Sequence, residues 1–375
     1  MVKVGVITWF KYHNYGTLLQ AVALQKYLLS EGYDPELINF EINDSKNNIK
    51  MKKYSIYERY CGILLRLAHF IYKNEIKNRN KEMDSFVINN CKVSKFISND
   101  SDYINVCNSY DYIVFGSDQI WNPNWYHPYY FGAKKGIMSE YVAYAPSIGI
   151  HEIDKDMFSI YKENLKRFKC IGMREKYAVD IISNMVDKKV FNVIDPVFLL
   201  NKSEWLKYQN CDKVPKVDYI LCYLLSDNSV HWKAIKKYAR RKNLKLVVIP
   251  VGGASFFKTK YTIAGCNIND FIGLINNASE VITDSFHGTA FSLILNKKFR
   301  VFERHNPNKL NSQNDRIYNI LNICNLNCDG VLIKYNSGII VDNTTLNYEI
   351  INHRLDKVII QSKKYLNDSL SNRKD

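Results

Sequence analysis

One segment of the sequence combines a short apolar strand, a polar turn that contains glycine, and the start of a helix. It runs from Val281 to Asn296 and reads VITDSFHGTAFSLILN. Backbone N–H groups and the dipole at a helix start attract phosphate and carboxylate groups, and Gly288 leaves room for such a ligand. His287 is expected at the carboxyl end of the strand, where ligands bind in open α/β sheets. The residues predicted to form this site are Asp284, Ser285, Phe286, His287 and Gly288.

The same segment also has a purely structural interpretation. Asp284 or Ser285 can cap the helix, and His287 can be a packed histidine with no chemical role. The coincidence of strand end, cap, histidine and glycine favours the anion site over this alternative.

A second strand, within Asp111–Pro123, also runs into a polar loop. Gly116 allows a ligand to approach the backbone closely, and the side chains that follow can bond sugar hydroxyls. The alternative is a tight turn in which the Asp118 carboxylate accepts from backbone donors. The candidate residues here are Gly116, Ser117, Asp118, Gln119 and Asn122.

A third candidate is Arg174, which follows the predicted strand Cys170–Met173. A guanidinium at this place can make a two-pronged contact with a carboxylate. Its alternative is an ion pair with Glu175 or Asp195, and Asp195 itself fits a structural turn before a proline.

The elements around these loops alternate between strands and helices. Thr17 is expected to cap a first helix that ends near Glu31, and amphipathic spacing predicts further helices at 56–71, 230–242, 270–278 and 347–366. Strands are predicted at 2–8, 35–40, 111–115, 140–145, 170–173, 190–194, 219–225, 244–250, 281–283 and 299–302. This alternation indicates an α/β fold with mainly parallel sheets covered by helices on both faces.

The composition is that of a globular protein of about two domains. The chain has 375 residues, of which 46% are hydrophobic and 24% charged. Lys and Arg outnumber Asp and Glu by 52 to 37, so the surface should attract anions. We find no signal peptide and no apolar stretch of membrane-spanning length, which predicts a cytoplasmic protein. Nine cysteines without a CxxC pair predict reduced thiols rather than a zinc site or disulfides.

The ordered set of motifs resembles the polysaccharide pyruvyl transferase family over about residues 1–325. The matching residues are Asn14-Tyr15-Gly16, Gly116-Ser117-Asp118-Gln119 with Trp121-Asn122-Pro123, Tyr144-Ala145, Arg174-Glu175, Asp195-Pro196-Val197, Asp284-Ser285-Phe286-His287-Gly288 and Asp315-Arg316. The resemblance implies two Rossmann-like domains in a GT-B-like arrangement with a central cleft. We place them at residues 1–212 and 213–340, with a C-terminal helix in 341–375 that can return to the first domain.

The resemblance also implies phosphoenolpyruvate as donor and a glycan or lipid-linked oligosaccharide as acceptor, joined as a pyruvate ketal. His287 is then the acid or the phosphate partner, and Asp118 is the weaker candidate for the base. Arg174 and Arg316 are candidates for clamps on the carboxylate and phosphate, and Asn14, Tyr15 and Gly16 complete the predicted substrate site. This scheme requires no metal and no cofactor.

Two other functions remain open. A GT-B-type glycosyltransferase would need a carboxylate for the ribose of a nucleotide sugar, and Glu303 is the nearby candidate. A non-catalytic module that binds polyanions would explain the basic charge but not the polar strand ends. No recognised nucleic-acid motif is present, so we expect no nucleic-acid partner.

Residues 44–100 match no part of the family pattern and predict a basic, helical insertion in the first domain. Between Asp44 and Glu82, ten Lys or Arg residues accompany four acidic ones. The structural interpretation is a helix whose apolar stripe packs on the first domain. The functional alternative is a helix that rests on an anionic membrane surface, which would make the protein peripheral at the inner membrane face.

Overall fold

The computed structural model describes residues 1–40, 56–307, 313–326, 330–342 and 345–371, and its strands form two parallel sheets. The first sheet has the order β2-β1-β3-β4-β5-β6. Its strands are β1 (Lys3–Ile7), β2 (Asp34–Leu37), β3 (Tyr112–Phe115), β4 (Glu140–Tyr144), β5 (Phe168–Met173) and β6 (Val190–Asn192). All of its strand pairs are parallel.

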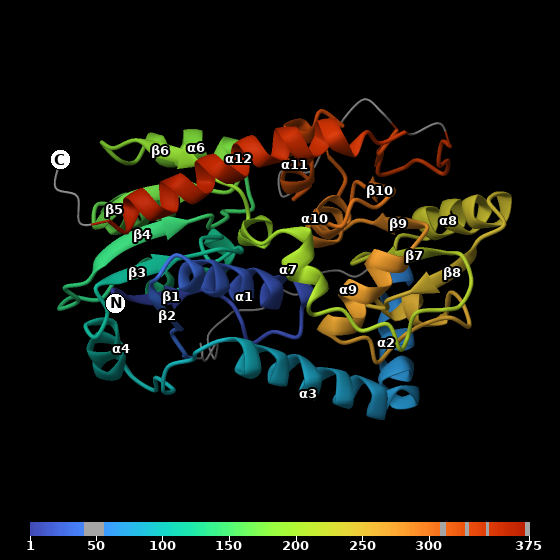
Figure 1. The fold of residues 1–375 in the computed structure, drawn as a ribbon, viewed down its shortest axis with the longest axis horizontal. Helices are drawn as coiled ribbons and strands as arrows, with labels where there is room; N and C mark the ends of the chain where they lie inside the picture. The colour runs from blue at the N-terminus through green and yellow to red at the C-terminus, as the bar shows by residue number, and fades with distance from the viewer. Residues whose placement is uncertain (41–55, 308–312, 327–329, 343–344, 372–375) are drawn as a thin grey trace.

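The second sheet has the order β11-β10-β9-β7-β8 and is also parallel throughout. Its strands are β7 (Tyr219–Tyr223), β8 (Lys245–Val248), β9 (Glu280–Thr283), β10 (Phe299–Phe302) and β11 (Leu332–Ile333). The two sheets lie side by side, at the left and right of Figure 1. The α/β fold with two Rossmann-like units in a GT-B-like arrangement is therefore confirmed.

Strand positions follow from runs of apolar residues that are buried on both sheet faces. Strands β3, β7, β9 and β10 are buried at every position, as expected when helices cover both sides of a parallel sheet. Each of the ten predicted strands is present, with ends that differ by a few residues. The two-residue strand β11 was not predicted because its apolar run is too short to stand out.

Helices and short 3-10 turns connect the strands. The α-helices other than those of the insertion are α1 (Tyr15–Ser30), α4 (Asp100–Cys107), α5 (Lys155–Leu165), α6 (Lys176–Ser183), α7 (Lys202–Leu206), α8 (Ser229–Arg241), α9 (Ile268–Asn277), α10 (Phe286–Ile294), α11 (Asp315–Cys324) and α12 (Tyr348–Ser369). The 3-10 turns are η1 (Pro123–Trp125), η2 (Pro128–Phe131), η3 (Pro196–Leu199) and η4 (Gly253–Phe257).

The start of α1 corrects one expectation. Asn14, and not Thr17, caps the helix, because the Asn14 side-chain oxygen accepts from the backbone N–H groups of Gly16 and Thr17. Thr17 lies inside the first turn, and its hydroxyl is free to reach a neighbouring loop.

A shared core joins the two sheets. One hydrophobic cluster includes Val6 of the first sheet and Val281 of the second, together with apolar side chains of α1, α9 and α10. Helix α12 crosses from the second sheet to the first, as its course along the top of Figure 1 shows. Near its end the Tyr365 hydroxyl donates to the Ala143 carbonyl of β4 at 2.9 Å.

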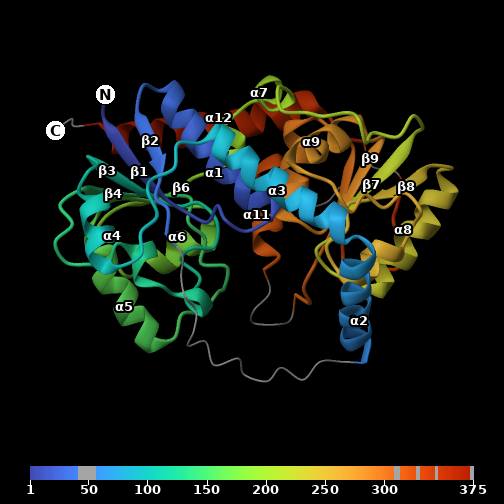
Figure 2. The same cartoon turned by 90° about the horizontal axis from the view of Figure 1, so that it is seen from below.

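The insertion contains two helices, α2 (Ile56–Ile71) and α3 (Lys73–Asn90), and both make contacts beyond the first domain. Helix α3 contacts α1 and α9, so it bridges the two sheets, and α2 packs on η4 beside the second sheet. Figures 1 and 2 show α3 running between the two halves of the molecule. We expected this segment to pack on the first domain. Helix α3 does contact α1 there, but α2 packs on the second domain, almost 200 residues further along the chain.

Two other features bear on earlier expectations. No helix in the described ranges is both long and apolar enough to cross a bilayer. The eight cysteines in those ranges are free thiols, while Cys328 lies outside them.

Candidate active site

The polar loops lie at the places where each sheet reverses its strand order. In the first sheet β1 lies between β2 and β3, and in the second β7 lies between β8 and β9. The chain therefore leaves neighbouring strands towards opposite sides of the sheet at these places. The crevice that this creates outside the strand ends is the usual ligand site of such sheets. The loop after β1 leads into Gly16, and the loop after β9 leads into His287.

His287 lies in the first turn of α10 and is directly against the first turn of α1. Ser285 caps α10, with its hydroxyl accepting from the Gly288 N–H at 3.3 Å, which confirms the predicted cap. A Cβ atom placed on Gly16 would lie 1.9 Å from Nδ1 of His287. The ring therefore occupies the space that a side chain at position 16 would need, and Gly16 lets the two helix starts meet.

The His287 ring is buried, with 7% of the residue exposed. Its Nε2 atom lies 3.8 Å from Oδ2 of Asp195, which is too far for a hydrogen bond, and it has no hydrogen-bond partner. Burial lowers the pKa of His287 below its ordinary value, although the carboxylates of Asp195 and Asp118 oppose this effect. The imidazole is consequently neutral at pH 7 and has one unsatisfied nitrogen.

Arg174 is held in place by two buried carboxylates. Its Nη1 donates to Asp195 at 2.7 Å and its Nε to Glu175 at 3.1 Å, so the ion-pair alternative is confirmed. These carboxylates outweigh burial and raise the pKa of Arg174. The guanidinium lies 5.0 Å from the centre of the Phe286 ring, a cation–π contact. Its third nitrogen, Nη2, is buried without a partner and remains available to a ligand.

Arg316 provides a second guanidinium from α11. Its Nη2 donates to the Gln313 side-chain oxygen at 3.0 Å, while its Nε is buried without a partner. Burial, together with repulsion from Arg174 and Arg304, lowers the pKa of Arg316 to about 10. Arg316 keeps its charge at pH 7, although the neighbouring cations repel it. A bound anion would offset this repulsion.

The loop after β3 reaches the same region. The Asp118 carboxylate accepts from the Thr17 hydroxyl at 2.7 Å and from the Gln119 N–H at 2.9 Å, so the predicted turn contact is present. Gln119 donates through its side chain to Gln313 at 3.3 Å, which links the first sheet to the second. Asn122 is fully buried, and its side-chain nitrogen has no partner.

Several predicted site residues have clear structural tasks. Asn14 caps α1, and the Tyr15 hydroxyl donates across the domains to the Cys266 carbonyl at 2.6 Å. Both Asp284 oxygens are already engaged, because they accept from the N–H groups of Leu225 and Ser226 after β7. Whether these residues also contact a substrate stays a prediction.

The two glycines of the strand-end loops are explained by packing. A Cβ atom on Gly288 would lie 2.3 Å from the Thr283 hydroxyl, and one on Gly116 would lie 2.1 Å from the Tyr144 carbonyl oxygen. Gly288 thus lets α10 approach β9, and Gly116 lets the β3 loop approach β4. We expected these positions to admit a ligand, but in both cases the close neighbour is the protein itself. Ser117 is buried in the same layer, with its hydroxyl donating to Ala145 at 2.9 Å.

Arg304 and Gln313 also belong to this cluster and were not predicted from the sequence. Gln313 accepts from Arg304 and Arg316 and so connects both cations. Arg304 follows β10 by two residues, and the strand-end argument used for Arg174 would have found it. Gln313 has no such signal, because it precedes α11 in a long connection.

A small cavity lies where the two sheets meet. Its lining comes from the ends of β5 and β6 on one side and from α10 and α11 on the other. The residues that line it are Arg174, Glu175, Ile194, Asp195, Phe286, Arg316, Asn319, Ile320 and Ile323. Its volume of about 10 Å³ is room for no more than one water molecule, so an anion between Arg174 and Arg316 requires the walls of the cavity to move apart. Within the described ranges, no cluster of three or more His, Cys, Asp or Glu side chains could hold a metal ion.

Gly16→Ala should displace the His287 ring, because the new methyl group would overlap Nδ1. We expect unfolding stability to fall by about 1–3 kcal/mol, as for other overpacked sites, and the pKa of His287 to move up towards its ordinary value. Denaturant titration and NMR of labelled histidine would measure both. Gly62→Ala is the control, since nothing lies within 4 Å of the added atom. An unchanged His287 pKa in Gly16→Ala would contradict the contact.

Solved structures with the same fold share little sequence with this chain. The UDP-GlcNAc 2-epimerase from Methanocaldococcus jannaschii has a TM-score of 0.51 and 12% identity, with 96% of this chain and 93% of that chain covered. S. aureus MnaA, solved with UDP, has a TM-score of 0.50 and 12% identity, covering 98% and 91%. A glycosyltransferase from Rickettsia africae has a TM-score of 0.50 and 11% identity, covering 99% and 94%. These likenesses concern the fold alone.

Sequence comparison is more specific than the fold. Comparison with curated protein sequences returned no match. The model of one protein family does match, over residues 14–306, which run from the cap of α1 to just after β10 and include His287, Arg174 and Asp195. The chain therefore belongs to the polysaccharide pyruvyl transferase family.

Proposed function

We propose that this protein transfers the enolpyruvyl unit of phosphoenolpyruvate to a glycan and closes it as a pyruvate ketal. The observation that carries the proposal is a set of three buried nitrogens that have no hydrogen-bond partner among the described residues, namely Nη2 of Arg174, Nε of Arg316 and Nε2 of His287. Unsatisfied buried polar groups are costly, and they are retained where a ligand satisfies them. Phosphoenolpyruvate offers a carboxylate and a phosphate to such a set.

The proposed reaction consists of two additions to one carbon. A proton adds to the methylene carbon of phosphoenolpyruvate, and a glycan hydroxyl attacks the central carbon. The C–O bond to phosphate then breaks, and a second hydroxyl of the same glycan takes its place. One hydroxyl proton replaces the proton consumed at the methyl group, and the other leaves with inorganic phosphate, so atoms and charge balance.

His287 is the proposed acid. Its pKa is low while the cavity is empty of anions, because burial disfavours the imidazolium. A phosphate dianion beside Nε2 favours the imidazolium and would outweigh burial. His287 is therefore protonated when the donor binds. The proton is then available to the methylene carbon only when the substrate is present.

Arg174 and Arg316 are the proposed clamps for the carboxylate and phosphate. Arg174 is pre-oriented by Asp195 and Glu175, which lowers the cost of fixing its side chain when the anion binds. Arg316 gains most from the anion because Arg174 and Arg304 repel it. The N–H groups of Phe286 and His287, which a helix leaves without helical partners, add donors at the start of α10.

The base for the glycan hydroxyl is a buried carboxylate. Asp118 is our first candidate, although both of its oxygens already accept hydrogen bonds. Glu175 is a second one, because its Oε2 atom is buried without a partner beside the cavity. The glycan acceptor, or a lipid-linked oligosaccharide, would enter from the open side of the cleft.

The nucleotide-sugar alternative has less support. Glu303 was the carboxylate expected to bind a ribose, but its oxygens accept from Tyr318, Lys334 and the Tyr335 N–H. These bonds hold it inside the second domain. The GT-B-like fold is common to both functions, so it does not choose between them.

Phosphate release should require phosphoenolpyruvate and a glycan with a suitable pair of hydroxyls, and no nucleotide. We expect His287→Gln to keep the fold, while turnover falls about 100- to 10,000-fold through loss of the acid. Acceptor-dependent phosphate release, with the ketal product identified by mass spectrometry, measures this. Calorimetric titrations with phosphoenolpyruvate and with UDP, run in parallel, measure donor binding in the absence of an acceptor. Binding of UDP in place of phosphoenolpyruvate would favour the glycosyltransferase.

Donor binding should take up protons near neutral pH. Burial lowers the pKa of His287 in the free protein and the bound phosphate raises it, so affinity increases as pH falls through the pKa of the complex and levels off below the pKa of the free protein. Calorimetry in two buffers with different ionisation enthalpies gives the number of protons taken up. The titrating phosphate contributes equally in His287→Gln, so the difference between the two proteins isolates His287. If the wild type and His287→Gln take up the same number of protons, His287 is not the group that is protonated on donor binding.

A further inference from the structure

Helix α2 has two apolar faces, and only one of them is covered. Cys61 and Ala68 are buried against η4, where the Gly253 position comes so close to α2 that a Cβ atom would lie 2.0 Å from the Cys61 carbonyl oxygen. The Tyr57 hydroxyl also donates to the Asp227 carbonyl at 2.6 Å. The helix is thus firmly fixed on the second domain, and its outward face is presented in a defined orientation.

The outward face of α2 is an apolar stripe. Its members are Tyr60, Ile63, Leu67, Phe70 and Ile71, which are 54, 62, 45, 80 and 51% exposed. At about 100° per residue, these positions fall within an arc of roughly 100° on one side of the helix. An exposed apolar stripe along one side of a helix is the feature by which amphipathic helices contact a membrane or a partner. Figure 2 shows α2 at the outer edge of the molecule.

Positive charge borders this stripe. Arg59 and Arg66 are exposed and lie roughly 20–40° beyond one edge of the apolar arc on the helical wheel. An apolar strip flanked by arginines is typical of helices that lie in the interface of an anionic bilayer. Four of the lysines counted in the sequence, at positions 46, 50, 52 and 53, fall outside the described residues and play no part in this argument.

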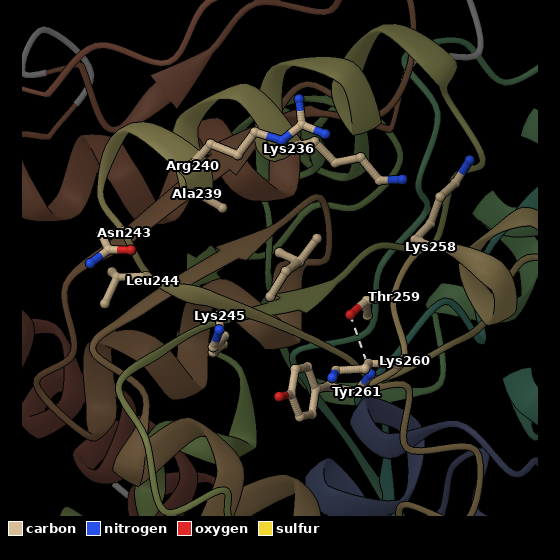
Figure 3. Close-up of a pocket in the computed structure, with 11 residues that line it drawn as sticks. Lys236, Ala239, Arg240, Asn243, Leu244, Lys245, Lys258, Thr259, Lys260 and Tyr261 are labelled. Carbon is tan, nitrogen blue, oxygen red and sulfur yellow. Dashed lines mark hydrogen bonds between the residues drawn. The ribbon is translucent and has the colours of Figure 1, made fainter.

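A basic pocket lies beside α2 on the same domain. It is formed by α8, the edge strand β8 and the segment after η4, and none of its lining residues is acidic. Figure 3 shows Lys236 and Arg240 on one side of it and Lys245 and Lys260 on the other. Lys258 completes the cationic set and directly follows η4, the turn on which α2 packs.

Two cations of this pocket lie over aromatic rings, Lys258 over Trp232 at 5.6 Å and Lys260 over Tyr261 at 5.3 Å. Burial and the neighbouring Lys236 lower the pKa of Lys258 below its ordinary value, although Asp227 opposes them. Phe257, the residue before it and the last of η4, is 41% exposed and adds an apolar side chain to the surface beside Lys258 in the sequence. A phosphate group in this pocket would relieve the repulsion, and lipid headgroups present many such groups on one plane.

We propose that the α2 stripe and the basic pocket form one surface that docks this protein on an anionic lipid bilayer. The apolar side chains of α2 enter the headgroup region, and the pocket binds the phosphates of anionic lipids. A second copy of the chain fits this surface poorly. The stripe of a 16-residue helix is about 24 Å long and about 10 Å wide, far below the roughly 800 Å² per partner of a stable interface. Pairing it would also bring like charges together.

Vesicle flotation of the full-length protein tests the proposal. The wild type should float with phosphatidylcholine vesicles that contain about 30% phosphatidylglycerol, much less with phosphatidylcholine alone, and less at high salt. Ile63→Asp with Phe70→Asp, and separately Lys236→Glu with Arg240→Glu, should each reduce the bound fraction about tenfold or more. Circular dichroism and thermal melting confirm that the variants are folded.

Two matched controls carry the same chemical changes elsewhere. Ile339→Asp with Ile360→Asp alters apolar residues that are 67 and 65% exposed, and Lys155→Glu with Lys162→Glu alters exposed cations of α5 on the first domain. Both should bind vesicles like the wild type. Equal loss in controls and test variants would show non-specific adsorption and overturn the proposal. So would a wild type that does not float but changes molar mass in light scattering when Ile63 and Phe70 are replaced, because α2 would then join copies of the chain.

Discussion

The contact between Gly16 and His287 is the constraint on which the candidate site depends. It brings the first turn of α1 against the first turn of α10, and so joins the strand-reversal points of the two sheets. Without a side chain at position 16, the imidazole fills the gap and is removed from water. Its burial lowers the histidine pKa, and its position leaves Nε2 facing Asp195 at a distance too long for a bond.

The two arginines near this contact differ in how far nearby carboxylates neutralise their charge. Arg174 is satisfied by Asp195 and Glu175 on two sides and keeps one free nitrogen, whereas Arg316 faces other cations and has only an amide oxygen as its partner. The first cation is therefore rigid, and the second is stabilised when an anion arrives. Such a pair supports tight and oriented binding of a small dianion, since orientation and attraction come from different residues.

The sequence was sufficient to predict the strands and the loops that follow them, because buried parallel strands are continuous apolar runs with polar ends. The Ser285 cap and the Arg174 ion pairs were also foreseen as alternatives, since both need only local sequence or one nearby carboxylate. The sequence could not predict why Gly16, Gly116 and Gly288 are glycines, because each depends on a neighbour brought close by folding. The packing of α2 on η4 was not predicted for the same reason, because Gly253 of η4 is distant from α2 in the chain.

The central claim is that the unpartnered guanidinium nitrogens bind the donor, and Arg316 tests it most directly because it makes no ion pair that holds the fold. Calorimetric titration of phosphoenolpyruvate into the wild type and Arg316→Lys isolates the contribution of the Nε donor, since lysine keeps the charge but has no nitrogen at that place. The account predicts an affinity at least tenfold weaker for Arg316→Lys, with unchanged thermal stability. Equal affinity in the two proteins would contradict it and place the donor elsewhere.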